Sequence, residues 1–257
     1  MHSEAAQHAR SRYLDLLERS ILDSIYGESA LELKLRNLVQ RLRHPYLTRR
    51  GTFGWPTRAH SMIGHKRIRN VRSLVERTLS ENVPGDYIET GVWRGGACIV
   101  MRGVLEAYDV RDRQVLCADS FEGLPRPNAE KYPADRRDRL FAFKQLAVSL
   151  ESVRQNFAAY GLLDEQVVFL KGFFKDTLPA LGHRRFALIR LDGDMYESTM
   201  DALINLYDRL SDSGFVIIDD YGGLRNCRQA VHDFLDQRNL RPEITAIDDC
   251  GVWWQKT

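Results

Sequence analysis

The chain has 257 residues, of which 44% are hydrophobic and 28% charged, as in an ordinary globular protein. Its 37 lysines and arginines against 35 acidic residues give a net charge of +2, which argues against nucleic-acid binding through charge alone. No apolar run approaches the roughly 20 residues of a membrane span, and residues 1–20 lack the apolar core of a signal peptide. We therefore expect a cytoplasmic protein with one α/β domain and an appendage.

The first 80 residues show helical patterns and no strand pattern. Residues 11–27 carry apolar side chains at helical spacing, and Gly27 is expected to end that helix. Residues 31–43 show a second helical pattern, a loop rich in proline and glycine covers 44–64, and residues 70–79 again indicate a helix. We expect a helical N-terminal extension over residues 1–80.

From residue 81 onward, strands and helices alternate. Strands are expected at residues 85–91, 114–120, 166–172, 185–194, 214–221, 243–249 and 252–256. Such alternation predicts a doubly wound, mostly parallel sheet, and the short link before the last strand predicts an antiparallel hairpin at one edge. Residues 125–145 are polar and then amphipathic, which indicates an insertion or lid within a domain spanning 81–257.

The first two expected strands end in groups that suit an adenosine ligand. Glu89-Thr90-Gly91 begins an E-T-G-x-x-x-G-G turn, which lets a ligand or a neighbouring segment approach the backbone closely. This turn has neither the G-x-G-x-x-G spacing of a dinucleotide fold nor the Lys-Ser/Thr of a phosphate loop. Asp119 ends the second strand, where a carboxylate accepts hydrogen bonds from ribose hydroxyls and repels phosphate. Together these features favour S-adenosylmethionine (SAM), whose cationic sulfonium also suits Glu89.

The fourth and fifth expected strands end in aspartates. Asp192 and Asp194 follow one strand and Asp219 and Asp220 the other, and neighbouring parallel strands lie about 4.8 Å apart. Carboxylates that close do not all stay ionised without a cation, and hard oxygen ligands without histidine favour Mg²⁺. Mg²⁺ at a vicinal diol lowers the pKa of the hydroxyl to be methylated, with Asp192 or Asp194 as general base. The alternative is that these acids only cap helices.

Several longer strings resemble one family. They are DxIETGVWRGGA (86–97), ADSFEG (118–123), FLKGFFKDTLP (169–179), LDGDMYESTMDAL (191–203) and GFVIIDDY (214–221). The chain resembles the macrocin O-methyltransferase family over residues 57–257, and HSMIG (60–64) resembles its HTMIG. That family methylates sugar hydroxyls on glycosylated macrolide and aminocoumarin antibiotics of the mycinamicin and novobiocin type.

The resemblance implies a Rossmann-like class I SAM-dependent fold, with Mg²⁺ at Asp192, Asp219 and Asp220. It implies Asp192 as the base, with Asp194 as the alternative. The implied SAM contacts are Met62, Ile63, Gly64, Glu89, Thr90, Gly91, Gly95, Asp119, Ser120, Gly172, Phe173 and Phe174. Residues 62–64 match a loop that closes over the cofactor in the family. The resemblance also implies homodimers or larger homo-oligomers.

Two regions depart from the family pattern, and both would cover the acceptor. Residues 28–55 and 125–145 are more basic than expected, and a solvated surface explains this better than an anionic acceptor. Arg94 is a candidate partner for the SAM carboxylate or a surface residue. A catechol-like acceptor would use the same metal chemistry. The missing dinucleotide motif argues against a nicotinamide-dependent oxidoreductase, and the intact aspartates argue against a non-catalytic relative.

Overall fold

The computed structural model describes residues 2–27 and 55–257, and these residues build a seven-stranded sheet in the order β3-β2-β1-β4-β5-β7-β6. The strands are β1 (Asp86–Thr90), β2 (Val115–Asp119), β3 (Val167–Lys171), β4 (Phe186–Leu191), β5 (Leu210–Ile218), β6 (Thr245–Ala246) and β7 (Val252–Gln255). β3, β2, β1, β4 and β5 are parallel, whereas β7 runs antiparallel to β5 and to β6. The predicted parallel sheet with an antiparallel edge hairpin is confirmed.

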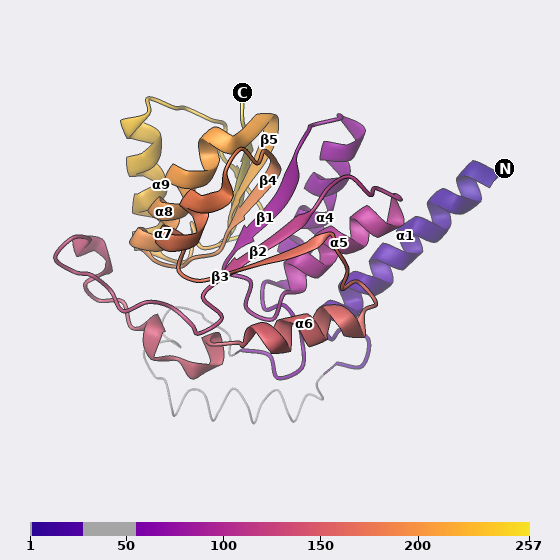
Figure 1. Ribbon diagram of the computed structural model, residues 1–257, viewed down its shortest axis with the longest axis horizontal. Coiled ribbons are helices and arrows are strands. Elements are labelled where there is room, and N and C mark those ends of the chain that lie inside the picture. Colours follow the sequence, from indigo (N-terminus) through magenta and orange to yellow (C-terminus); the bar gives the residue numbers. More distant parts are fainter. Residues whose placement is uncertain (1, 28–54) are drawn as a thin grey trace.

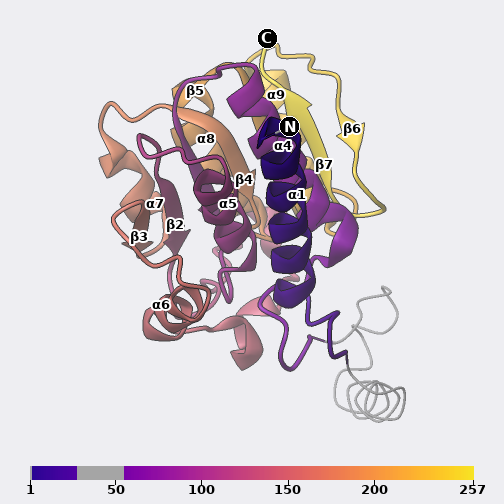
Figure 2. The ribbon, with the colours of Figure 1, turned by 90° about the vertical axis from the view of Figure 1, so that its right-hand side faces the viewer.

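Helices cover both faces of the sheet (Figure 1). On one face lie α1 (His2–Ile21), α4 (Gly64–Ser80), α5 (Gly96–Ala107) and α6 (Leu150–Ala159), and on the other α7 (Phe174–Thr177), α8 (Tyr196–Leu206) and α9 (Arg225–Gln237). Figure 2 shows α1 beside α4, with β7 and β6 beyond them at the edge of the sheet. Arg72 of α4 joins the two helices, because its Nη1 contacts Asp15 at 2.8 Å and the buried Glu18 at 3.0 Å.

The strands are apolar runs because helices bury both of their faces. All six residues of β4 are buried. Side chains alternate along each strand, so Leu188 packs into the core beneath α4 and α5, whereas Ile189 packs into the core beneath α8 and α9. β1 and β4 are neighbours at the point where the strand order reverses, and ligands of such sheets bind beyond the carboxyl ends of the strands at this crevice.

The helix boundaries differ from the expected ones near the N-terminus. α1 ends at Ile21, and Gly27 (φ +66°) follows an intervening turn instead of ending the helix itself. α4 begins at Gly64, six residues before the predicted start, so the 62–64 segment leads directly into it. The predicted helix at 31–43 lies outside the described residues, as does the basic region 28–55 apart from Trp55. No helix in the described ranges is both long and apolar enough to cross a membrane.

The expected insertion at 125–145 is folded against the rest of the domain. It contains three short 3-10 helices at Pro133–Asp135, Leu140–Ala142 and Lys144–Leu146. The indole Nε1 of Trp93 donates to the carbonyl oxygen of Gln145 at 2.9 Å, and the rings of Trp55 and Phe143 lie 5.2 Å apart. The insertion therefore packs against the turn after β1 and the segment before α4.

Candidate functional site

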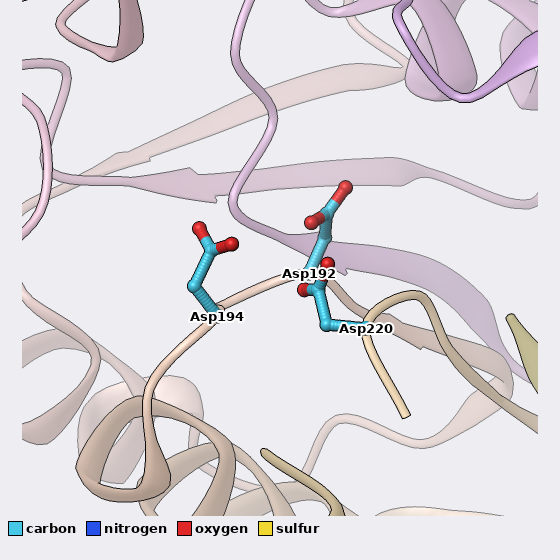
Figure 3. Close-up of side chains that lie close together, drawn as sticks. All are labelled: Asp192, Asp194 and Asp220. Carbon is cyan, nitrogen blue, oxygen red and sulfur yellow. The ribbon is translucent and has the colours of Figure 1, made fainter. Parts of the chain in front are cut away.

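Three carboxylates meet beyond the ends of β4 and β5 (Figure 3). Asp192 and Asp194 follow β4 and Asp220 follows β5, and one oxygen of each lies within 4.8 Å of the others. Among the described residues, Oδ2 of Asp220 is buried without a hydrogen-bond partner. Burial and then the neighbouring aspartates raise the pKa of Asp194 and of Asp220 well above the ordinary value. A bound cation would therefore be favourable at this cluster.

Asp219, predicted as a metal ligand with Asp192 and Asp220, faces a different environment. One of its oxygens is bound by Arg190 and the other by Arg67, and the residue is 3% exposed. Successive side chains at the end of an extended strand point in opposite directions, which separates Asp219 from Asp220. The structure thus brings Asp192 and Asp220 together as expected, but Asp194 and not Asp219 lies with them.

Arg190 is the centre of a buried ion network that the sequence analysis missed. It is 1% exposed in β4, and its guanidinium contacts Glu89 of β1, Asp219 and, at 2.9 Å, Asp192. Arg67 of α4 extends the network from Asp219 to Asp248 at 3.1 Å. A buried carboxylate without a partner costs several kcal/mol, so these arginines offset part of the cost of burying the acids beneath the site. The single charge in the apolar run of β4 was the available signal.

Glu89, predicted to contact SAM, lies in the interior. It is 2% exposed, and its carboxylate accepts a hydrogen bond from the Cys98 thiol at 2.8 Å and pairs with Arg190. Burial raises the pKa of Glu89 to about 7, although Arg190 lowers it. Thr90, the next predicted contact, is fully buried. In the structure Glu89 therefore links β1 to the arginine network.

The glycines after β1 are required by packing. A Cβ on Gly91 (φ +85°) would lie 1.8 Å from the carbonyl oxygen of Asp192, because the β4 backbone passes directly beside it. A Cβ on Gly95 (φ +86°) would lie 2.9 Å from Cγ1 of Val153 in α6. The sequence allowed either a ligand or a neighbouring segment to approach this turn closely. The close approach of neighbouring segments is enough to account for both glycines.

Arg94 holds the segment that precedes α4. Its Nη1 donates to the carbonyl oxygens of Pro56, Thr57 and Ala59 at 3.2, 3.1 and 2.8 Å. In the structure the guanidinium is therefore engaged with the backbone of residues 56–59, and the predicted pairing with a SAM carboxylate would have to compete with these three bonds.

Asp119 organises the turns around the first two strands. Its Oδ2 accepts from the backbone N–H of Val92 at 2.8 Å and its Oδ1 from that of Phe121 at 2.7 Å. Burial raises the pKa of Asp119, and these hydrogen bonds to the ionised form oppose the rise. Ser120 donates to the carbonyl oxygen of Gly123 at 2.6 Å.

The remaining predicted SAM contacts lie around the same edge. Gly172 (φ +145°) donates its N–H to the carbonyl oxygen of Asp119 at 2.9 Å, and Phe173 beside it is 36% exposed. The backbone N–H of Gly96 donates to the carbonyl oxygen of His60, which places the 60–64 segment against the turn after β1. In that segment Met62 is 38% exposed and Ile63 is buried, and Gly64 begins α4. Phe174 begins α7 and packs partly into the core beneath α8 and α9.

Comparison with known proteins identifies the family of the chain. Residues 10–256 match the model of the macrocin O-methyltransferase family. The chain belongs to this family. It is 46% identical to mycinamicin III 3''-O-methyltransferase of Micromonospora griseorubida over 95% of this chain and 96% of that protein. It is 47% identical to demethyldecarbamoylnovobiocin O-methyltransferase of Streptomyces niveus over 96% of this chain and 94% of the relative.

Solved structures agree with this membership. The O-methyltransferase NovP superposes with a TM-score of 0.86 at 46% identity, covering 96% of this chain and 99% of NovP. The calicheamicin methyltransferase CalS11 superposes with a TM-score of 0.60 at 18% identity over 95% of this chain and 91% of its own, which supports the fold alone. This macrocin-type enzyme is thus a SAM-dependent O-methyltransferase with the class I fold.

Proposed function

We propose that the chain transfers the methyl group of SAM to a sugar hydroxyl of a glycosylated natural product, with the help of Mg²⁺. The relatives support the acceptor class, because they are named for methylation of mycinamicin III, of a novobiocin precursor and, in Streptomyces olivaceus, of a rhamnosyl-tetracenomycin. The tetracenomycin enzyme is 48% identical over 98% of this chain. A catechol-like acceptor would be served by the same acids, but none of these three names contains one.

The acidic cluster is the observation that supports a divalent cation. Asp192, Asp194 and Asp220 offer three hard oxygen ligands within 4.8 Å, and one oxygen of Asp220 has no partner among the described residues. This donor set fits Mg²⁺. When bound, the ion would lower the pKa of the acceptor hydroxyl and orient it.

We assign Asp192 and Asp220 as ligands, since both the family resemblance and the geometry include them. The family resemblance adds Asp219, but Arg190 and Arg67 bind its two oxygens, so ligation by Asp219 requires sharing or releasing an arginine. Asp194 is then either the third ligand or the base in place of Asp192, because a carboxylate that holds a cation is a poor proton acceptor.

SAM would bind beside this cluster, along the ends of β1, β2 and β3. The proposed contacts are the segment 62–64, Gly91, Gly95, Asp119, Ser120 and the turn 172–174. These residues would hold the acceptor oxygen in line with the bond from the sulfonium sulfur to its methyl group, near van der Waals contact. Such positioning removes much of the entropic barrier. Contact with Glu89 and Thr90 would require that their buried side chains become accessible. Segment 62–64 would cover the cofactor as part of an N-terminal extension over residues 1–80.

Calorimetric titration of the metal-stripped protein tests these assignments. We expect SAM to bind, and Mg²⁺ to bind wild type but at least tenfold more weakly to Asp220→Asn. Asp194→Asn should retain Mg²⁺ and lose turnover if Asp194 is the base. Asp219→Asn should weaken Mg²⁺ binding if Asp219 is the third ligand. A wild-type protein that binds SAM and turns over fully in a metal chelator would contradict the metal role. Light scattering on the same sample tests the proposed homo-oligomer.

A further inference from the structure

Asp135, in the first 3-10 helix of the insertion, is fully buried. Its Oδ1 accepts from the backbone N–H of Tyr196 at 2.8 Å and from Nδ2 of Asn226 at 2.9 Å. Its Oδ2 accepts from the backbone N–H of Glu197 at 3.0 Å. These three hydrogen bonds make Asp135 a specific structural contact, because the loss of any one of them would leave a buried charge poorly solvated.

The three donors belong to the first turns of two helices, α8 and α9. Neither helix receives a side-chain hydrogen bond from the residue at its own N-cap, Met195 for α8 and Leu224 for α9. Asp135 caps α8 from 61 residues earlier in the chain, and its negative charge is favoured at the positive end of that helix. It reaches α9 through the side-chain amide of Asn226.

These helix ends directly follow the acidic cluster. Asp192 and Asp194 lie in the link between β4 and α8, and Asp220 lies in the link between β5 and α9. By binding the first residues of both helices, Asp135 fixes the distal ends of both links. The separation between Asp194 and Asp220 therefore depends on a residue of the insertion.

A second acid of the insertion, Asp138, lies near the start of α9. Asp138, three residues after Asp135, accepts a hydrogen bond from Nδ2 of Asn226 at 3.4 Å, and its charge contributes to the raised pKa of Asp194. The other end of the insertion is held on the cofactor side, where Trp93 donates to Gln145. The segment therefore spans the mouth of the site from the β1 turn to the helices after β4 and β5.

We propose that Asp135 is a positioning residue that fixes the insertion onto the starts of α8 and α9 and so sets the spacing of the acidic cluster. This inference rests on the proposed function for its consequence in metal binding. It predicts that the insertion is a fixed wall of the acceptor site and not a freely opening lid.

Asp135→Asn is the test, because it keeps the side-chain shape while an amide NH₂ replaces one acceptor. Glu130→Gln, on an exposed acid of the same insertion, is the matched control. The first readout is trypsin cleavage at the exposed Arg136, Arg137 and Arg139, followed by mass spectrometry. The second is amide exchange of residues 193–197 and 222–226, and the third is calorimetric affinity for Mg²⁺ and for SAM.

We expect Asp135→Asn to be cleaved faster and to exchange faster in both links. We also expect it to bind Mg²⁺ about tenfold more weakly, as for loss of a residue that orients a metal ligand, and SAM within about twofold of wild type. Unchanged cleavage and exchange would overturn the proposal, as would equal weakening of SAM and Mg²⁺, which marks a general loss of structure. If wild type binds no Mg²⁺, the metal assignment fails, and the cleavage and exchange results still decide whether Asp135 holds the links.

Discussion

The acidic residues at the carboxyl edge of the sheet have different partners in its two halves, the ends of β1 and β2 and the ends of β4 and β5. On the cofactor side, Asp119 accepts hydrogen bonds from two backbone N–H groups and Glu89 is bound by Arg190 and Cys98. On the acid side, Asp194 and Asp220 lie against like charges, and an oxygen of Asp220 has no partner in the described part of the chain.

The difference shows in which half the protein itself supplies partners for its buried carboxylates. Directed donors offset part of the cost of burying a carboxylate, whereas crowded carboxylates oppose folding unless a cation binds them. Arg190 lies between the halves, because it contacts Glu89 on one side and Asp192 and Asp219 on the other. Substitutions at these positions can therefore test whether the acids of the two halves differ in their effect on stability.

Replacement of Arg190 should have the largest effect. Arg190→Met leaves Glu89 and Asp219 buried with fewer compensating charges, and breaking such a network typically costs about 3–5 kcal/mol. We expect the free energy of unfolding in urea to fall by about that amount. Arg241→Met removes an exposed arginine paired only at the surface, at 66% exposure, and should change stability by less than about 1 kcal/mol. Similar small effects for both variants would show that the two halves are not joined through Arg190.

Asparagine substitutions in the two halves should have opposite signs. Asp119→Asn loses a charged acceptor of backbone N–H groups and should destabilise the metal-free protein by about 1–2 kcal/mol. Asp220→Asn relieves repulsion among buried carboxylates and should stabilise the metal-free protein by about 1 kcal/mol while weakening turnover. Urea unfolding in a metal chelator measures both. Destabilisation by both variants would mean that Asp220 has a structural partner and that the halves are alike.

The sequence predicted the strands of both halves better than their electrostatic partners. Apolar runs, glycines and aspartates at strand ends depend on local chemistry, so β1 to β5 and the position of Asp192 beside Asp220 followed from them. The pairing of Asp219 with Arg67 depends on how α4 packs across the sheet, over 152 residues of chain. Asp135 acts on α8 from a polar insertion without any local helix-cap pattern. Such long-range contacts leave no spacing signal in a single sequence.

Arg94 offers a moderate test on the cofactor side. Arg94→Lys replaces a planar group that reaches three carbonyl oxygens of residues 56–59 with a single ammonium. Because this segment leads to residues 62–64, we expect the KM for SAM to rise about fivefold to tenfold, or roughly 1–1.4 kcal/mol, with kcat little changed. Steady-state kinetics with a relative's acceptor measures the split. A fall in kcat with an unchanged KM would place Arg94 on the acid side of the comparison.

Asp201 of α8 belongs to neither half, and burial is the main cause of its raised pKa. Burial, and then Glu197, raises the pKa of Asp201 to about 6, although Lys131 and Lys175 oppose the rise. The folded-state pKa is higher than the unfolded one, so the protonated carboxyl contributes stability that is present below about pH 4 and is lost as the pH rises through about 6.

Because the side chain is partly exposed, we expect the loss to be no more than about 1 kcal/mol. Urea unfolding at about pH 4 and about pH 7 should show it as a smaller pH-dependent decrease in Asp201→Asn than in wild type. Parallel pH profiles would mean that the two lysines already neutralise Asp201.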